Sequence, residues 1–430
     1  MSTPLSAIKS AAADVLIVGA GPAGATASLF LGQAHIPHTL IDKATFPREK
    51  ADGNVYGSKV IEILDRLNPN YFPELMAQAE QTLGCATAHI FTPNGERFTL
   101  NFAKSPVNGA NNHAASPAQV SDDIPFFTMN RRHFDNFLVN KLDHAYVDLH
   151  FGTTITALER QQTQWQVTLE TSGQTTHLTP KLIIAADGAK SSVVQQLGLM
   201  PPIERYYDSV QGYFRGVTGF EQIETPAGAT QAGYASHIEA HFLPTSNPGF
   251  FFIAPLANGI FNVGVGKPRR DVQQQNMDLH QVVDAVIRNH PKLAARFTHS
   301  EPVSDLRPWP EIVGALGRVP VSGPGYLIVG DAAGLCNPLT CFGTGNAMIS
   351  GMLAAQQVKQ SVTQQRFDGA TLNAYDQALY QRLQREFQIG NLLKKVTQRD
   401  WLFNLVTRNR PVRSLLRQSF QGTLAMLQQL

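Results

Sequence analysis

One strand–turn–helix–strand segment near the N-terminus restricts the fold more than any other feature of the sequence. Its first part, DVLIVGAGPAG at Asp14–Gly24, contains an apolar run, Val15–Val18, that leads into the spacing Gly-x-Gly-x-x-Gly. A helical pattern follows over Pro22–Leu31, and Thr39–Ile41 is a second strand-like run. Such a βαβ unit is typical of an open, mostly parallel sheet with helices on its faces. The sequence therefore predicts an α/β fold.

The three glycines of this turn have separate roles in binding a dinucleotide. Gly19 permits the tight turn, Gly21 lets a pyrophosphate approach the backbone, and Gly24 lets the helix pack on the strand. The phosphate then lies at the helix N-terminus, where unpaired N–H groups and the helix dipole favour anions. Asp42 ends the next strand, where an acid binds a ribose hydroxyl. The first half of the predicted cofactor site comprises Gly19, Gly21, Pro22, Ala23, Gly24, Asp42 and Lys43.

A second glycine-rich stretch, GDAAGLCNPLTCFGTGNAMISG at Gly330–Gly351, favours FAD over a nicotinamide cofactor. It follows the strand-like run Tyr326–Val329 and opens a helix. FAD is long and needs a second binding region for its ribityl chain and ring, which Asp331 and the glycines of this stretch supply. The new helix would point its N-terminus at the edge of the flavin ring that becomes negative on reduction. The second half of the predicted site comprises Gly330, Asp331, Gly343, Thr344, Gly345 and Asn346.

Composition limits the remaining classes of protein. The chain has 430 residues, enough for two or three structural units. A net charge of +2 argues against a nucleic-acid binder. Three cysteines give no disulfide framework and indicate a reducing, cytoplasmic environment. We see no signal peptide and no apolar run of membrane-spanning length.

Six motifs together resemble one group of flavoproteins. They match, in order along nearly the whole chain, the FAD-dependent oxidoreductases with the para-hydroxybenzoate-hydroxylase-like fold, and within them the geranylgeranyl reductase-like branch. The motifs are VGAGPAG, FPREK followed by ADGN, RRHFDNFL, AADGAKS, and the hairpin GFFFIAPLANGIFNVGVG together with the later GDAAGLCNPLT and GTGNAMISG.

The resemblance adds expected roles for further residues. It implies that Arg131, Asp187 and Gly188 bind FAD and that the hairpin covers a substrate cavity. Strand alternation then directs one or two of the rings of Phe250–Phe252 at the cavity and the others at the core. We expect Phe250, Phe252 and Pro255 to line it, although plain core packing explains these aromatic side chains equally well.

The implied architecture is an FAD-binding, Rossmann-like domain of the type found in glutathione reductase, with an inserted β-sheet substrate domain and a helical C-terminal tail. The FAD-binding domain would comprise residues 1–75, 126–200 and 311–365. The substrate domain would comprise residues 76–125 and 201–310, and residues 366–430 would form the tail.

Departures from the branch leave the chemistry open. Asp52 stands where the reductases have a cysteine linked to alkene reduction, and Cys341 and Phe342 replace a small residue and an acid beside the flavin. These three residues are the catalytic candidates. We expect an FAD-dependent oxidoreductase that acts as a reductase on an apolar prenyl, lipid-like or aromatic molecule. The alternative is a monooxygenase or halogenase that acts through a C4a-hydroperoxyflavin, which Asn346 favours, and a prenyl-binding chaperone without flavin is a third interpretation.

The electron donor would be NAD(P)H, docking transiently, or another donor would supply the electrons, because the sequence has no second Gly-x-Gly-x-x-Gly after a strand. His237 and His241 suggest a metal, but residues four apart on a strand lie too far apart to share one ion, so we expect no metal site. The tail carries seven basic residues from Lys394 to Arg417 against one acid. It is either a helical cap or a peripheral contact with the inner face of a membrane. The sequence does not decide the oligomeric state.

Overall fold

The computed structural model describes residues 14–50, 53–102, 124–220, 233–243, 249–397 and 399. The chain divides into two compact units, each built from separate segments. The first unit comprises Met1–Lys50, Arg132–Arg205 and Glu311–Asn391. The second unit comprises Ala51–Arg131, Tyr206–Pro310 and Leu392–Leu430.

A six-stranded sheet forms the centre of the first unit. Its strand order is β20-β21-β12-β1-β2-β8, and every pair is parallel except β20 with β21. The four residues of β1 and the four of β12 are all buried, as apolar strands covered on both faces require. The strands are β1 (Val15–Val18), β2 (His38–Asp42), β8 (Val147–Phe151), β12 (Leu182–Ala185), β20 (Ser322–Gly323) and β21 (Tyr326–Ile328).

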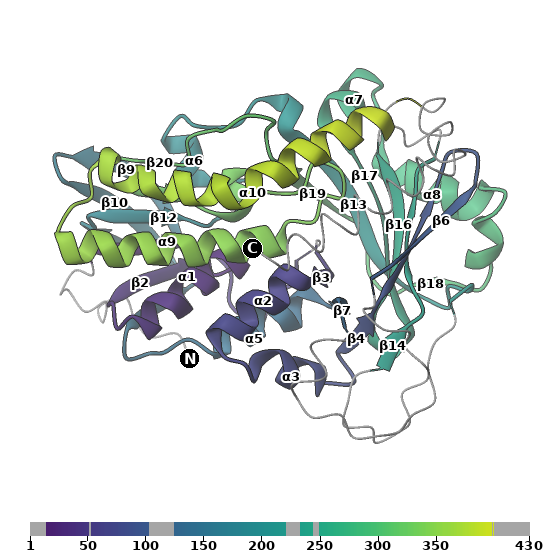
Figure 1. Ribbon diagram of the computed structural model, residues 1–430, viewed down its shortest axis with the longest axis horizontal. Helices are drawn as coiled ribbons and strands as arrows, with labels where there is room; N and C mark the ends of the chain where they lie inside the picture. Colours follow the sequence, from purple (N-terminus) through teal and green to yellow (C-terminus); the bar gives the residue numbers. More distant parts are fainter. Residues whose placement is uncertain are drawn as a thin grey trace. The chain divides into compact units, whose positions relative to one another are not determined.

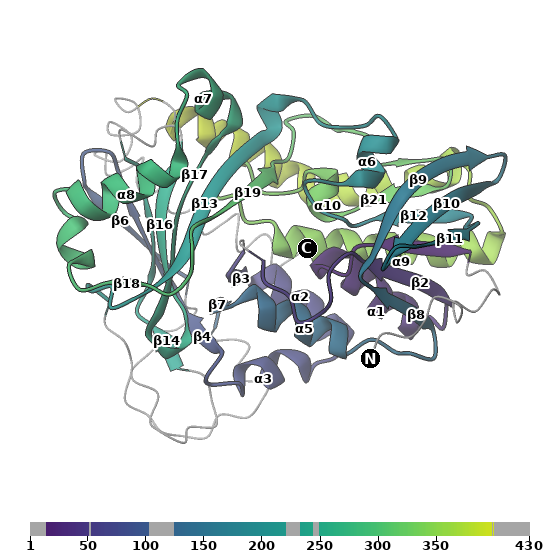
Figure 2. The same ribbon diagram turned by 180° about the vertical axis from the view of Figure 1, so that it is seen from behind.

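Helices and a small antiparallel sheet cover the two faces of this sheet. The three-stranded sheet β9 (Thr153–Gln161), β10 (Gln164–Thr171) and β11 (Gln174–Leu178) lies on one face, and α9 (Thr344–Gln364) and α10 (Gly369–Thr397) lie on the other (Figures 1 and 2). The other helices of this unit are α1 (Pro22–Gln33), α5 (Arg131–Asn140), α6 (Ser192–Gln196) and the 3₁₀ turns Ile203–Arg205 and Gly330–Ala333.

The helices α1 and α9 pack tightly against each other because glycine is present at the contact (Figure 1). A Cβ atom at Gly351 of α9 would overlap the carbonyl oxygen of Ala23 in α1. Gly330 follows β21 and lets α1 lie close to the edge of the sheet, because a Cβ atom at Gly330 would lie only 2.9 Å from the Cβ of Ala23 in α1. The two glycine-rich stretches of the sequence therefore meet at one edge of the sheet.

An eight-stranded sheet forms most of the second unit. Its main order is β18-β13-β17-β16-β15-β5-β6, and β19 pairs with β13. The strands are β5 (Thr87–Phe91), β6 (Arg97–Asn101), β13 (Tyr206–Arg215), β15 (Ile238–His241), β16 (Phe250–Pro255), β17 (Ile260–Pro268), β18 (Glu301–Pro302) and β19 (Arg307–Ile312). One face packs against α8 (Leu279–Asn289) and the 3₁₀ turn Ala294–Phe297, and Phe251, Val263 and Val283 lie in that core.

A four-stranded sheet and short helices complete the second unit. The sheet order is β14-β4-β7-β3. Its strands are β3 (Val55–Gly57), β4 (Thr82–Cys85), β7 (Phe126–Met129) and β14 (Gly233–Ala235), and the helices are α2 (Ser58–Leu67), α3 (Tyr71–Met76), α7 (Arg269–Gln274) and the 3₁₀ turn Ala257–Gly259.

The α/β fold and the local elements agree with the sequence analysis. The observed β1, α1 and β2 match the predicted βαβ unit, and β16 and β17 form the predicted hairpin around Asn258-Gly259. The tail beyond residue 401 and the loop at residues 105–123 lie outside the described residues. In the part of the chain that the structure describes, no helix is both long and apolar enough to cross a membrane.

The borders of the two units differ from the expected domain limits. Residues 51–75, expected in the FAD-binding domain, belong to the second unit because β3 pairs with β7 there. Residues 126–131 belong to it for the same reason. Conversely, α10 as far as Asn391 belongs to the first unit, where Tyr375 of this helix donates to the carbonyl oxygen of Ile328 in β21.

Candidate functional site

The turn between β1 and α1 is shaped by two of its glycines. Gly19 has φ of +104°, a left-handed backbone, and a Cβ atom there would overlap the carbonyl of Ala186. A Cβ atom at Gly24 would overlap the carbonyl oxygen of Gly19. Packing within the protein therefore accounts for both glycines.

Gly21 differs, because nothing in the protein requires a glycine there. Its φ of −68° suits any residue, and the nearest atom to an added Cβ would be Nη2 of Arg48 at 3.5 Å, an ordinary contact. Gly21 is also the N-cap of α1, which has no side-chain cap, and Pro22 begins the helix. A missing side chain before an uncapped helix N-terminus fits the close approach of a phosphate. The turn thus fits the pyrophosphate of FAD.

Asp42 supports the turn and keeps acceptor capacity for a ligand. Its Oδ2 accepts from the backbone N–H of Ala20 and its Oδ1 from that of Ala44, both at 2.8 Å. A carboxylate offers about four acceptor sites. The remaining sites suit the ribose hydroxyls expected from the sequence. Lys43 follows on the surface, where its side chain is exposed.

Arg48 is a further candidate that the sequence analysis did not single out. Its Nη2 is 3.2 Å from Oδ2 of Asp135, which is buried, and its guanidinium lies over the ring of Phe46. These contacts fix a cation next to Gly21, where it would offset phosphate charge. The FPREK motif was the available signal.

The second glycine-rich stretch places an acid and a helix N-terminus together. A Cβ atom at Gly343, the N-cap of α9, would lie 3.2 Å from Oδ1 of Asp331. The helix α9 has no side-chain cap and no acid in its first turn. The thiol of Cys336 donates to Oδ1 of Asp331 at 3.4 Å, and burial raises the pKa of that thiol well above its ordinary value. This region therefore offers a partial positive charge and an anionic acceptor to a flavin.

Hydrogen bonds hold the loop before α9 in one conformation. Oδ1 of Asn337 accepts from the backbone N–H groups of Leu339 and Thr340. Cys341 has a left-handed backbone with φ of 56°, and its N–H donates to the carbonyl of Asn337. Phe342 is 50% exposed, although it is a large apolar residue. Phe342 therefore remains available for contact with an apolar group.

Asn346 and Asp187 have side chains that support loops. Nδ2 of Asn346, a buried residue, donates to the carbonyl of Leu335. The carboxylate of Asp187 accepts from Ser191 and Ser192 at the start of α6. Gly188 has a left-handed backbone with open space around a Cβ position. Contact of these residues with FAD stays a prediction.

The hairpin in the second unit sorts its aromatic side chains onto two faces. Phe251 is fully buried in the core against α8, whereas Phe250 and Phe252 are partly buried on the other face, with ring centroids 6.3 Å apart. A Cβ atom at Gly264, opposite Phe252, would lie 2.7 Å from that ring. We call the face with Phe250 and Phe252 the hairpin face. Pro255, at the end of β16, is buried, and its carbonyl accepts from Thr128.

Polar groups lie on the same face, because paired residues of neighbouring strands point the same way. Asn262 is paired with Tyr213, and Nδ2 of Asn262 donates to Oε1 of Gln211 at 2.9 Å. The hydroxyl of Tyr213 donates to Oδ1 of Asn54 at 3.2 Å. The hairpin face therefore combines aromatic rings with a phenol.

Two predicted residues, Asp52 and Arg131, belong to neither of the glycine-rich stretches described above. Asp52 lies outside the described residues. Arg131 is buried in the second unit, where its backbone N–H donates to Oδ1 of Asn54. Their roles stay predictions.

Asp331→Ala is expected to weaken FAD binding roughly 10- to 150-fold, because a charge-assisted hydrogen bond contributes about 1.5–3 kcal/mol. Titration of the apoprotein with FAD, followed by flavin fluorescence, measures the change. Asp143→Ala, an exposed acid in the same unit, is the control and should bind FAD as the wild type does. If both variants bind FAD with equal affinity, Asp331 does not contribute to the FAD site.

A family model for an FAD binding domain matches residues 12–385 of the chain. This range includes every described residue assigned above to the cofactor site.

Two relatives of this chain carry names that point to different chemistries. A digeranylgeranylglycerophospholipid reductase of Methanopyrus kandleri is 24% identical over 397 residues, covering 89% of this chain and 86% of the relative. A 1H-pyrrole-2-carbonyl-[peptidyl-carrier protein] chlorinase of Pseudomonas fluorescens is 21% identical over 369 residues, covering 84% and 79%.

Among solved structures, a geranylgeranyl bacteriochlorophyll reductase-like protein of Thermoplasma acidophilum is similar with a TM-score of 0.75 and 20% identity. The match covers 94% of this chain and 95% of that one. At this identity the likeness establishes the fold.

Proposed function

The chain belongs to the FAD binding domain family, and from this premise we propose that it is an FAD-dependent reductase of an apolar, prenyl-bearing molecule. Two features, each described within its own unit, carry the proposal: the phosphate turn at Gly21 and the aromatic hairpin face. The first fits a dinucleotide, and the second suits a flat or chain-like hydrocarbon. The reductase relatives, named for a geranylgeranyl lipid, support the same substrate class.

The proposal assigns the apolar part of the substrate to Phe250 and Phe252 of the hairpin face. Aromatic rings bury a large apolar area and contact the carbon chain without needing a hydrogen bond from it. Phe250 and Phe252 are partly buried, unlike the fully buried Phe251 between them, so they retain surface for a ligand.

Phe252→Ala should lower kcat/KM for a geranylgeranyl lipid at least about tenfold, since loss of an aromatic contact removes more than about 1.4 kcal/mol. The flavin spectrum should stay unchanged. Phe91→Ala is the control, because Phe91 is a partly buried ring on the opposite face of the same sheet. If both variants turn over at the same rate, the hairpin face is not the substrate site.

Reduction of a carbon–carbon double bond needs a hydride, which bound reduced FAD supplies, and a proton, which the protein must deliver. Asp52 occupies the cysteine position of the reductase motif and is one proton donor in this proposal. Tyr213 is the other, since its phenol lies on the hairpin face and is oriented by Asn54.

Tyr213→Phe is expected to slow product formation roughly 100-fold, the lower range for loss of a general acid. FAD binding and flavin reduction by NAD(P)H should remain normal. The solvent deuterium isotope effect on product formation should change in this variant. An unaltered rate and isotope effect would leave Asp52, or a water that it holds, as the donor.

A halogenase or monooxygenase is the second candidate. The chlorinase relative favours it, as does the loop at Cys341 and Phe342, which departs from the reductase motif. The exposed ring of Phe342 would help to exclude water from a pocket in which reduced flavin reacts with O2.

Product analysis separates the two candidates. The purified holoprotein is incubated in air with NAD(P)H, chloride or bromide, and either a geranylgeranyl lipid or a pyrrole or phenol. The proposal expects saturated lipid that gains two hydrogens per double bond, and unchanged aromatic compounds. Halogenated or hydroxylated products with no saturated lipid would overturn it.

We also propose that the basic C-terminal tail contacts a membrane surface that holds the lipid substrate. Lys394 and Lys395 lie in the last turn of α10 and Arg399 follows it, and the other basic residues of the tail lie outside the described residues. Sedimentation with anionic vesicles tests this, and loss of binding is expected when the chain is shortened after residue 397. Binding that survives the truncation would reject the tail as the contact.

A further inference from the structure

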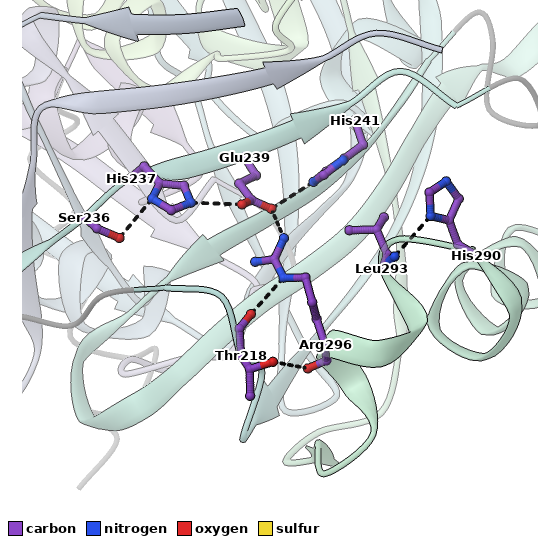
Figure 3. Close-up of polar contacts among 8 residues, drawn as sticks. All are labelled: Thr218, Ser236, His237, Glu239, His241, His290, Leu293 and Arg296. Carbon is purple, nitrogen blue, oxygen red and sulfur yellow. Dashed lines mark hydrogen bonds and ion pairs between the residues drawn. The ribbon is translucent and has the colours of Figure 1, made fainter. Parts of the chain in front are cut away.

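The second unit contains a buried group of histidines around one glutamate that the flavin chemistry does not use. His237, Glu239 and His241 alternate along β15 and its approach, so their side chains share one face of the sheet (Figure 3). The neighbouring strand β5 runs parallel and places His89 directly beside Glu239 in the register. His89 and Glu239, 150 residues apart in the sequence, are therefore neighbours on paired strands.

We propose that His89, His237 and Glu239 bind a divalent transition-metal ion, with Zn²⁺ as the expected occupant. One ligand atom from each of the three residues lies within 4.8 Å of the others. Nε2 of His237 is already 2.9 Å from Oε1 of Glu239. Two imidazoles and a carboxylate are a common ligand set for such ions, with a water in the fourth position.

The second contacts of these ligands match what a metal site requires. The ring nitrogen of His237 that faces away from Glu239, Nδ1, is 2.9 Å from Oγ of Ser236, which fixes the ring orientation (Figure 3). Oε2 of Glu239 accepts from Nε2 of His241 at 2.8 Å and from Nη1 of Arg296 at 2.6 Å. The carboxylate is therefore held through Oε2, and Oε1 is directed at His237.

His89 distinguishes this group from a simple buried ion pair. The ion pair with Arg296 already balances the charge of Glu239, so charge balance does not require His89. Within the described residues the imidazole of His89 stacks on His237, with centroids 4.0 Å apart, and makes no hydrogen bond. Its nitrogens are therefore available to a ligand. A shift of the partly exposed His89 ring would bring one of them to the 2.0–2.1 Å or so typical of zinc–nitrogen bonds.

The charge states also suit metal binding. Burial, aided by the nearby charge of His237, lowers the pKa of His89 to about 4, so this imidazole is neutral at pH 7. Burial acts to raise the pKa of Glu239, but hydrogen bonds from His237, His241 and Arg296 outweigh it and hold the pKa well below its usual range. When the ion binds at Nε2 of His237, the neutral imidazole carries its one proton on Nδ1, which donates to Oγ of Ser236, and the N–Zn bond replaces the hydrogen bond to Glu239.

The ion would have a structural role, because it would connect two neighbouring strands of the sheet. In the sheet, β5 and β6 join the other strands through the pairing of β5 with β15. A metal bound by His89 on β5 and by two residues at β15 would join these two strands by coordination as well as by backbone hydrogen bonds. Such a site stabilises the second unit and takes no part in the flavin reaction.

Untagged, full-length holoprotein is stripped with a chelator, dialysed and titrated with Zn²⁺ by calorimetry. We expect one tight site per chain. Co²⁺ should give a visible absorption band that Zn²⁺ abolishes. No binding by the wild-type protein would overturn the proposal.

His89→Gln is the decisive variant, because His89 makes no hydrogen bond to another described residue that the fold would lose. This variant should melt like the metal-free wild type. It should no longer bind one zinc ion per chain, and it should lack the Co²⁺ absorption band. His177→Ala removes an exposed histidine from the first unit and should leave both unchanged. Zinc binding that persists in His89→Gln, or disappears in His177→Ala, would place the ion elsewhere.

Discussion

The Gly24→Ala variant is expected to be purified without flavin and with a destabilised first unit. The added methyl group would overlap the carbonyl oxygen of Gly19, which is part of the turn itself. The start of α1 would therefore be pushed away from the turn that follows β1. Overpacking of a tight core costs about 1–3 kcal/mol, and this overlap with backbone belongs at the upper end or beyond. The ratio of flavin to protein absorbance and a thermal melt by circular dichroism measure both effects.

Gly317→Ala is the matched control for this result. Gly317 lies in an exposed part of the same unit, and no atom lies within 4 Å of its added Cβ position. This control should bind flavin and melt as the wild type does. A yellow Gly24→Ala protein with an unchanged melt would contradict the role of Gly24 in helix–strand packing.

Gly21→Ala is expected to give the opposite pattern, a stable protein that binds FAD poorly. The fold tolerates a methyl group here, because its nearest neighbour would be Arg48 at 3.5 Å and the backbone is in an ordinary conformation. A bound phosphate would be displaced from the N–H groups of α1. Each charge-assisted hydrogen bond lost costs about 1.5–3 kcal/mol, or roughly 10- to 150-fold in Kd. Titration of apoprotein with FAD measures the loss.

Gly57→Ala controls for the helix-capping part of the Gly21→Ala effect. Gly57 is the N-cap of α2, also without a side-chain cap, and has no atom within 4 Å of its added Cβ position. Both variants should show the same small change in melting temperature of the apoprotein. If Gly21→Ala binds FAD as tightly as Gly57→Ala does, the turn is a structural feature and not a phosphate site.

The elements that the sequence predicted are those with strong local signals. The run Val15–Val18 before Gly19 could only be a buried strand entering a tight turn, and the structure places β1 at these residues. The hairpin around Asn258-Gly259 likewise followed from a turn pair between two apolar runs. Resemblance added the family, which the match to residues 12–385 confirms.

The features that the sequence did not reveal depend on pairing between distant strands. His89 meets Glu239 through the pairing of β5 with β15, which no local pattern predicts. The border at Lys50 depends on β3 pairing with β7, although residues 51–75 looked like a continuation of the first domain. In the sequence, Arg48 is one basic residue of a loop. Only the structure shows that its ion pair with Asp135 fixes it beside Gly21.

The most direct test of the central claim is an anaerobic, single-turnover reaction. Holoprotein reduced with dithionite is mixed with a geranylgeranyl lipid in the absence of O2, and flavin absorbance and product mass are followed together. The account predicts that oxidised FAD returns in step with saturation of double bonds, one flavin per bond. Flavin that stays reduced until O2 is admitted, with products that then carry oxygen or halogen, would contradict it.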